Sequence, residues 1–398
     1  MRFHFYLLLL SLLFACKTPV PLAIVSDLAE SGISKAEAKA MKQLITTEYQ
    51  HELARKKTKE WKNLELSFGE YTMPFTYKKF GKEPDNGYPL YISMHGGGGT
   101  TAEVNDQQYK NQQRLYDATM KDMAGIYLTP RAPTNSWNLW HQSHIDELFN
   151  QLIQLAIIKE SIDPNRVYLL GYSAGGDGVY QLAPRMADRF AAAAMMAGHP
   201  NDASPLSLRN LPFALQVGAE DASYNRNTVA AAWGQQLDAL QKNDAEGYQH
   251  LVKIHAKKGH WMDLEDAIAL PWMAKHVRNP IPEKLVWMQG GTAHQQFYWL
   301  GMPDSLSSRR RPILAEYKRE SNTIYITDNY AAVLYVYLDD RMLDLDKEVT
   351  LISDGRQIFK GMVYRKPEYI RETLANKGDP NLAFYARLTI KTTQTVSP

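Results

Sequence analysis

The stretch Val167-Tyr168-Leu169-Leu170-Gly171-Tyr172-Ser173-Ala174-Gly175 joins an apolar run directly to a turn of small residues that contains a serine. Its last five residues match G-x-S-x-G, in which the serine lies on a sharp, strained turn between a strand and a helix. Glycines two positions either side of Ser173 let the strand and the helix approach closely. The competing interpretation is a glycine-rich turn with a surface serine. The apolar strand before the motif, and Gly176 with a helix-compatible segment after it, favour the nucleophile turn.

Apolar runs alternate with helical patterns on both sides of this stretch. Runs that predict buried strands lie at residues 90–94, 125–128, 167–170, 190–196, 212–217 and 251–255. Helical stripes lie between several of them, at residues 148–155 and 229–240. Upstream, a capping-box pattern at Ser34 and Glu37 predicts a helix to about residue 59, and residues 64–80 predict a hairpin. The pattern predicts an α/β fold with a mostly parallel sheet between helices, whose site lies at the carboxyl ends of the strands.

The pattern changes after Arg278-Asn279-Pro280-Ile281-Pro282, which reads as a linker because two prolines in three residues stop the preceding helix. Beyond it, short strands are predicted at residues 323–327, 332–338, 349–353, 357–364 and 382–390, with a helix only at about 367–376. Such spacing indicates a small β-rich sandwich, with an immunoglobulin-like arrangement as one candidate. We therefore expect a catalytic domain at 31–279, including the N-terminal helix and hairpin, and a β-sandwich-like domain at 283–398.

A serine nucleophile on such a turn needs a base and an acid that orients the base, and the acid precedes the histidine in the chain. The strand at 212–217 runs into Gly218-Ala219-Glu220-Asp221, where Asp221 is our choice and Glu220 the reserve. The competing interpretation of Asp221 is a helix cap or turn carboxylate. After the last strand stands His260, which we predict to be the base. Four other histidines are interpreted as packed, solvent-facing, in a loop or lining the cleft: His141, His144, His250 and His255.

A glycine-rich loop, His95-Gly96-Gly97-Gly98-Gly99, follows an earlier predicted strand. The amide of Ala174 supplies one oxyanion donor in such a site, and a backbone amide of Gly96 or Gly97 supplies the second. A phosphate-binding loop is excluded, because the lysine that follows the last glycine of such loops is missing here.

Trp137, Trp140 and His141 fall in the loop after the strand at 125–128, on the expected active-site side. They are candidates for an aromatic wall against a phenolic or sugar-ester substrate, and burial against the core is the equal alternative. His141 and His144 form an i, i+3 pair without further ligands, which is too weak for a metal site. The predicted chemistry requires no metal or organic cofactor.

The first fifteen residues resemble a signal peptide, with Arg2 before an apolar run from Phe5 to Phe14. Leu13-Phe14-Ala15-Cys16 is similar to the bacterial lipobox, and Cys16 is the single cysteine of the chain. We expect cleavage before Cys16, its lipidation, and a tether over residues 16–30. The alternative is a plain signal peptide with an incidental cysteine. The protein is expected to be a lipoprotein of the bacterial cell envelope, located in the periplasm or at the cell surface.

The composition excludes several function classes. The 398 residues are 44% hydrophobic and 22% charged, which is typical of a globular protein and not of a disordered one. The formal net charge is +2 and no long basic stripe is present, so nucleic acid is not an expected partner. The membrane is expected as a partner only through the lipid anchor.

The segment from about residue 88 to 278 resembles the α/β-hydrolase superfamily. It is most similar to secreted esterases related to polyhydroxybutyrate depolymerases, feruloyl esterases and dienelactone hydrolases. The resemblance implies Ser173 as nucleophile, Asp221 as acid, His260 as base, and Gly96 or Gly97 with Ala174 as the oxyanion hole. It implies a serine esterase that acts on a small-molecule or polysaccharide-linked ester. The alternatives are a peptidase of the prolyl-oligopeptidase type and a non-catalytic binding protein on the same scaffold.

Overall fold

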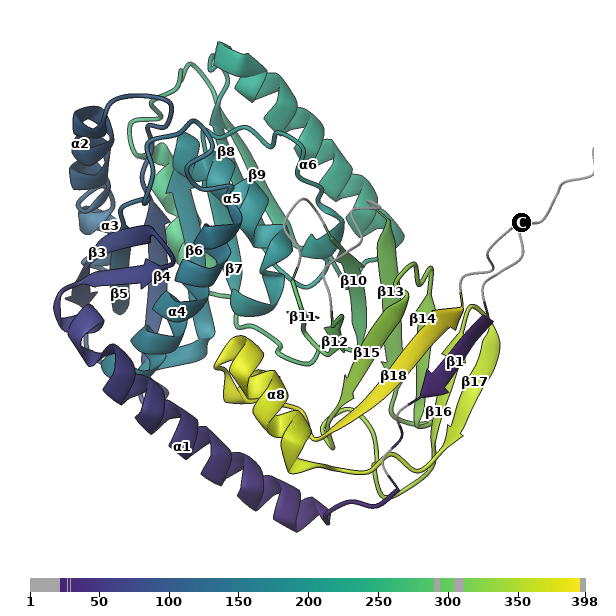
Figure 1. Cartoon of the computed structure of the whole chain (residues 1–398). Helices are drawn as coiled ribbons and strands as arrows, with labels where there is room; N and C mark the ends of the chain where they lie inside the picture. The colour runs from purple at the N-terminus through teal and green to yellow at the C-terminus, as the bar shows by residue number, and fades with distance from the viewer. Residues whose placement is uncertain (1–21, 27, 29, 290–293, 304–310, 394–398) are drawn as a thin grey trace, which may run out of the picture.

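The computed structural model describes residues 22–26, 28, 30–289, 294–303 and 311–393. The predicted signal peptide and Cys16 lie outside these residues. Figure 1 shows two parts, one built of strands and helices and the other mainly of strands. Within the described residues, no helix combines the length and the apolar character needed to cross a membrane.

The first part is centred on a sheet of eight strands among the described residues, in the order β2-β3-β5-β4-β6-β7-β8-β9. Pairing is antiparallel between β2, β3 and β5 and parallel from β5 through β9. The strands are β2 (Glu65–Phe68), β3 (Tyr71–Phe80), β4 (Tyr88–Met94), β5 (Gly125–Pro130), β6 (Ile162–Tyr172), β7 (Ala192–Met196), β8 (Phe213–Gly218) and β9 (His250–His255). This arrangement confirms the α/β class and the mostly parallel sheet.

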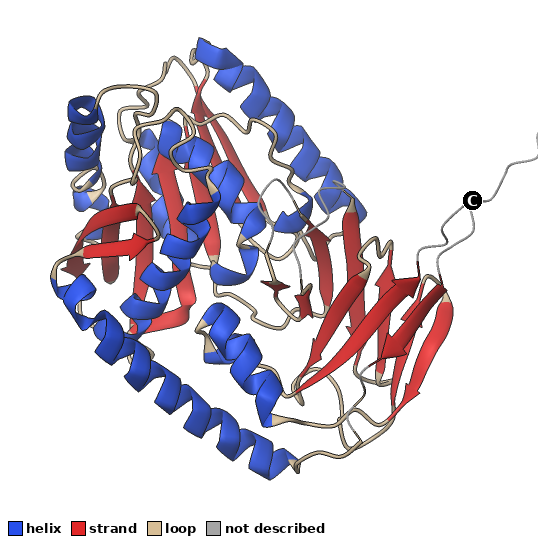
Figure 2. Ribbon diagram, viewed as in Figure 1, coloured by secondary structure: helices blue, strands red, loops and turns tan. Residues whose placement is uncertain are grey.

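Helices cover both faces of this sheet, as Figure 2 shows. The helices of this part are α1 (Lys35–Lys62), α2 (Ala102–Gln112), α3 (Asp117–Met120), α4 (Ser143–Glu160), α5 (Ala174–Arg185), α6 (Arg226–Asn243) and α7 (Ala269–Met273). Alternate residues of one strand enter different cores: Leu169 packs with α4, α5 and α6 residues, whereas Tyr168 and Leu170 pack with α3 and α7 residues. Because both faces of the sheet are buried in this way, successive residues of a strand are all apolar, and the strands appear in the sequence as continuous apolar runs.

The second part consists of two five-stranded sheets within the described residues, ordered β1-β18-β15-β12-β11 and β10-β13-β14-β16-β17. Its elements are β1 (Leu22–Ser26), β10 (Lys284–Met288), β11 (Gln296–Phe297), β12 (Leu300–Gly301), β13 (Pro312–Lys318), β14 (Thr323–Thr327), β15 (Val333–Leu338), β16 (Val349–Ser353), β17 (Arg356–Gly361), α8 (Pro367–Lys377) and β18 (Ala386–Thr393). The five strands and the helix predicted for this region are present, and β10 to β13 had not been predicted.

The expectation of a tether over residues 16–30 is wrong for residues 22–26. They form β1, which pairs antiparallel with β18 and places Val25 opposite Ile390 (Figure 1). Ala23 and Val25 pack against the core while Ile24 is exposed. This alternation is that of a half-buried strand, which five residues between prolines and polar residues do not reveal alone.

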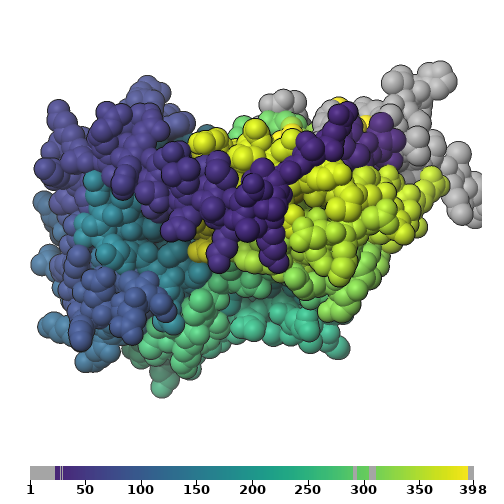
Figure 3. All heavy atoms as spheres, turned by 90° about the horizontal axis from the view of Figure 1, so that it is seen from below, coloured from purple at the N-terminus to yellow at the C-terminus, as the bar shows by residue number. Residues whose placement is uncertain are grey.

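The two parts share one continuous hydrophobic core. The predicted linker is also anchored, because Arg278 is buried and its guanidinium donates to Asp379 and to Asn165 at 2.5 and 2.8 Å. Helix α1 packs against α8 through Ala38, Ile45 and the α8 residue Ile370. Figure 3 shows the purple N-terminal residues extending across both parts.

Candidate active site

Ser173 stands at the turn between β6 and α5, with φ +57° and ψ −122°. A non-glycine residue in that region of backbone space is strained and is held there by its surroundings. A Cβ on Gly171 would lie 2.2 Å from the Gly175 carbonyl oxygen, and one on Gly175 would lie 2.2 Å from that of Met94. Neither clash can be relieved without moving backbone. The two glycines of the motif are therefore required by the close packing of β4, β6 and α5.

The structure brings Ser173, His260 and Asp221 together. His260 Nε2 lies 3.0 Å from Ser173 Oγ, and His260 Nδ1 lies 2.8 Å from Asp221 Oδ2. When Nδ1 carries its proton and donates it to the carboxylate, Nε2 is left as an acceptor for the serine hydroxyl. Asp221 is 2% exposed, whereas the reserve candidate Glu220 is exposed to solvent. Of the two acidic residues, the structure therefore places Asp221 and not Glu220 against His260.

The loops that carry Asp221 and His260 lie side by side after β8 and β9. The Glu220 amide donates to the Lys258 carbonyl at 2.8 Å, and a Cβ on Gly218 would lie 2.1 Å from the Gly259 carbonyl. Arg226 Nη1 lies 3.6 Å from the second carboxylate oxygen of Asp221. Asp221 is thus fixed by backbone packing, with a guanidinium within ion-pair distance of its carboxylate.

A further carboxyl group, Asp177, lies one turn into α5. Burial raises its pKa to about 6, although it accepts a hydrogen bond from the His199 amide at 2.6 Å. It forms no hydrogen bond with His260. Asp177 is close enough to His260 for their charges to interact, but the carboxylate that bonds to His260 is that of Asp221.

The rival histidines are engaged elsewhere. His255 is buried, with its Nε2 2.7 Å from Gln216 Oε1 and its Nδ1 3.1 Å from a Glu265 carboxylate oxygen. His250 bonds to Asp238, and His144 is buried and stacked on Tyr71 with ring centroids 3.6 Å apart.

The glycine loop after β4 lies directly beside Ser173. A Cβ on Gly96 would lie 3.1 Å from Ser173 Cβ, and Gly97 has a φ of +106°. Asn105 holds the loop by accepting from the Gly98 amide at 2.8 Å. His95 is buried, which lowers its pKa to about 4, and its Nε2 accepts from the Ala132 amide at 3.1 Å. These contacts support a rigid loop, and the oxyanion roles of Gly96, Gly97 and Ala174 stay predictions.

A cavity of about 510 Å³ opens at Ser173 and His260. Apart from His260, its lining among the described residues contains no ionisable side chain other than Tyr172. The lining consists of Gly96, Gly97, Gln108, Asn111, Gln112, Leu115, Tyr172, Ser173, His260 and Trp261. Amide side chains of α2 form one wall, and the ring of Trp261 contributes to another.

Of the two interpretations of the predicted aromatic wall, burial against the core is the correct one for Trp140, and the cavity is lined by a tryptophan that the sequence reasoning missed. Trp140 is fully buried and its indole N–H donates to the His95 carbonyl at 2.9 Å. Trp137 is 63% exposed with its ring edge-on to His141, and neither lines this cavity. Trp261, 49% exposed, lines it instead. Its signal in the sequence is its position directly after His260.

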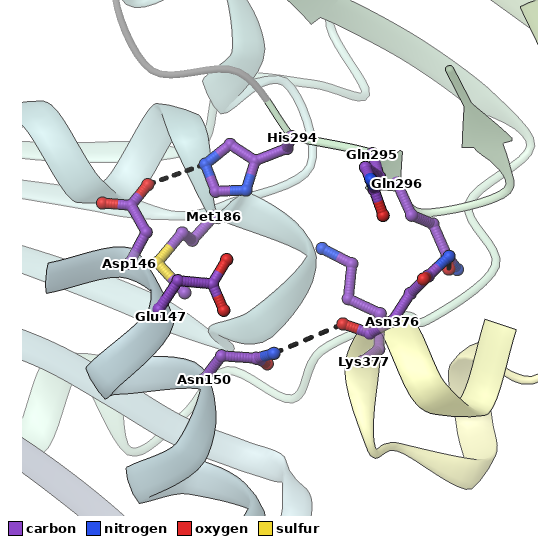
Figure 4. Close-up of a pocket in the computed structure, with 9 residues that line it drawn as sticks. All are labelled: Asp146, Glu147, Asn150, Met186, His294, Gln295, Gln296, Asn376 and Lys377. Atoms are coloured by element: carbon purple, nitrogen blue, oxygen red, sulfur yellow. Dashed lines mark hydrogen bonds and ion pairs between the residues drawn. The ribbon is translucent and has the colours of Figure 1, made fainter. Parts of the chain in front are cut away.

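A second cavity, of about 270 Å³, lies between α4, α8 and the segment before β11 (Figure 4). His294 donates to Asp146 across its rim at 2.7 Å, and Asn150 donates to the Asn376 carbonyl at 3.3 Å. The described residues that line it include no serine, threonine or cysteine. No group of three or more histidine, cysteine or acidic side chains placed to hold a metal occurs in the described part of the chain.

No protein-family model matches the chain, and no curated protein matches it in sequence. Among solved structures, a thermostable esterase is 19% identical with a TM-score of 0.39 and covers 54% of this chain and 63% of its own. A feruloyl esterase module from Clostridium thermocellum is 16% identical with a TM-score of 0.35, covering 51% and 88%. A poly(3-hydroxybutyrate) depolymerase from Bordetella parapertussis is 14% identical with a TM-score of 0.40, covering 53% and 86%. Neither substrate nor reaction follows from similarity at this level, so both are inferred from the site.

Proposed function

We propose that this protein is a serine hydrolase that cleaves carboxylic esters through an acyl-enzyme on Ser173. The observation that carries the proposal is the hydrogen-bonded series from Ser173 through His260 to buried Asp221, at 3.0 and 2.8 Å. An unactivated serine hydroxyl is a weak nucleophile, and an adjacent base held in one tautomer by an acid is the arrangement that activates it. The strained turn at Ser173 presents the hydroxyl to the cavity.

In the proposed reaction, His260 Nε2 takes the Ser173 proton as Oγ attacks the ester carbonyl carbon. Asp221 stabilises the imidazolium that forms. The amides of Ala174 and of Gly96 or Gly97 stabilise the oxyanion. Collapse of this intermediate breaks the bond to the alcohol, which leaves with the proton from His260. Water then attacks the acyl group with His260 again as base, and releases the acid and free Ser173.

The cavity supports an uncharged substrate. Buried charges need partners, and the described lining offers none besides the catalytic histidine. The α2 amides Gln108 and Asn111 can hydrogen-bond hydroxyl or carbonyl groups, and Trp261 offers an apolar ring face. A small-molecule or polysaccharide-linked ester fits this combination. We also propose that Cys16 carries a lipid anchor, and that the β-rich part, with its two five-stranded sheets, is an accessory domain of the immunoglobulin-like sandwich type.

Replacement of Ser173 tests the proposal. Ser173→Ala should remain folded and lose ester hydrolysis by several orders of magnitude, and a fluorophosphonate probe should label wild type but not the variant. Ser67→Ala, at an exposed serine of β2, is the control and should retain labelling and turnover. A panel of p-nitrophenyl esters and aminoacyl-p-nitroanilides separates the alternatives. Faster turnover of the anilides would indicate a peptidase. Absence of turnover and labelling would indicate a binding protein.

A further inference from the structure

The residue before the nucleophile makes contacts that its position in the motif does not require. Tyr172 ends β6 and is 8% exposed. Its hydroxyl donates to the His260 carbonyl oxygen at 2.7 Å and accepts from the Met262 amide at 3.1 Å. Its ring meets the His260 and Trp261 rings at centroid distances of 6.0 and 5.8 Å. One side chain therefore contacts three consecutive residues of the loop that carries the base.

We propose that Tyr172 is a positioning residue that holds the His260 loop in register with Ser173. Because Tyr172 and Ser173 are neighbours in the chain, the end of β6 fixes the nucleophile through its backbone and the base through this hydroxyl. This inference rests on the proposed function, since it assigns a catalytic consequence to the loop contacts.

The hydroxyl is suited to hold backbone rather than to react. A phenol has one proton to donate and lone pairs to accept, and both are used here on a carbonyl and an amide two residues apart. Burial raises the pKa of Tyr172 well above its usual value, so that the donor proton stays in place. Tyr172 lines the cavity through its ring, while its oxygen is committed to the loop.

The loop has a second anchor on the other side of His260. There the Lys258 carbonyl accepts from the Glu220 amide at 2.8 Å. Loss of the Tyr172 hydroxyl would leave the anchor at Lys258 and release the carbonyl of His260 and the amide of Met262. The imidazole would then sample positions away from Ser173 Oγ. Misplacement of a reacting group by about 1 Å can cost about 100-fold in rate.

The test compares Tyr172→Phe with Tyr168→Phe. Tyr168 lies on the same strand, is fully buried, and donates its hydroxyl to the His276 carbonyl at 2.8 Å. Both variants keep the ring and remove one buried hydroxyl, which makes two hydrogen bonds to backbone at Tyr172 and one at Tyr168, so both should lower the temperature of thermal unfolding. Tyr172→Phe alone should lower kcat on a p-nitrophenyl ester by about 10- to 100-fold with little change in KM. It alone should also speed amide hydrogen exchange in peptides covering residues 256–264.

The exchange measurement does not depend on catalysis, so it separates failure of this inference from failure of the proposed function. Unchanged exchange in Tyr172→Phe overturns the inference even in a chain that hydrolyses no ester. Faster exchange with a wild-type kcat overturns the catalytic consequence. An equal loss of kcat in Tyr168→Phe would show that the loss in Tyr172→Phe comes from general destabilisation of the fold, and would overturn the inference as well. Wild-type hydrolysis without Ser173 labelling refutes the proposed function on separate grounds.

Discussion

Asp221→Asn perturbs the proposed triad at its buried end while leaving its shape almost unchanged. With the new amide N–H₂ toward His260, Nδ1 must accept, and the ring proton moves to Nε2, where it faces Ser173 and prevents proton abstraction. With the amide oxygen toward His260, the N–H₂ group faces Arg226, whose guanidinium lies 3.6 Å from the present carboxylate. Either orientation also removes the negative charge that stabilises the imidazolium.

The size of the loss follows from the geometry. Opposite charges about 4 Å apart interact by about 4 kcal/mol at an effective dielectric constant of about 20. The His260 side chain is 43% exposed, so solvent screens part of this, and about 2–3 kcal/mol remains. This loss corresponds to about a 100-fold decrease in kcat, to which the wrong tautomer adds.

The assay is steady-state hydrolysis of p-nitrophenyl acetate, with Glu220→Gln as the matched control. That variant removes the same charge one residue earlier, at an exposed side chain, and should keep kcat within about twofold. KM should change little in either variant, because neither carboxylate lines the cavity. A kcat loss of less than about tenfold in Asp221→Asn, or a larger loss in Glu220→Gln, would refute the assignment of the acid.

Trp261→Ala should raise KM for an aromatic ester because the ring lines the cavity, whereas Trp137→Ala should leave KM unchanged; equal effects would contradict the observed lining. Asp177 has a folded-state pKa of about 6 against an ordinary 3.8, so the native state binds the extra proton and the contribution of this carboxyl group to the free energy of unfolding should fall as the pH rises from 4 to 6. In urea unfolding, the free energy of unfolding of wild type minus that of Asp177→Asn should therefore decrease across this range, and a difference that does not change with pH would exclude this role of Asp177. Cys16→Ser should abolish palmitate incorporation and partition into detergent; recovery of wild-type protein soluble, unlabelled and cleaved elsewhere would replace the lipobox with a plain secretory signal.

The sequence by itself determined the sheet of the first part and the turn at Ser173. The signals for both are local. Apolar runs mark the strands, and at the turn only glycine fits at position 171, against the backbone of Gly175, and at position 175, against the backbone of Met94. It also placed Asp221 and His260 at the ends of the correct strands, because the carboxyl ends of parallel strands meet at one edge.

Only the tertiary structure distinguished between candidate residues that are adjacent in the chain, and between side chains that are buried in the core and side chains that line the cavity. Asp221 and Glu220 are equal in chemistry and adjacent in the chain, and only packing buries the first against His260 and leaves the second in solvent. Trp140 and Trp261 both stand in loops at the active-site edge, yet one fills the core beneath His95 and the other lines the cavity. Strand β1 exists only because β18, more than 350 residues later, offers it an edge. Such outcomes depend on surfaces assembled from distant segments, which no local pattern of residues contains.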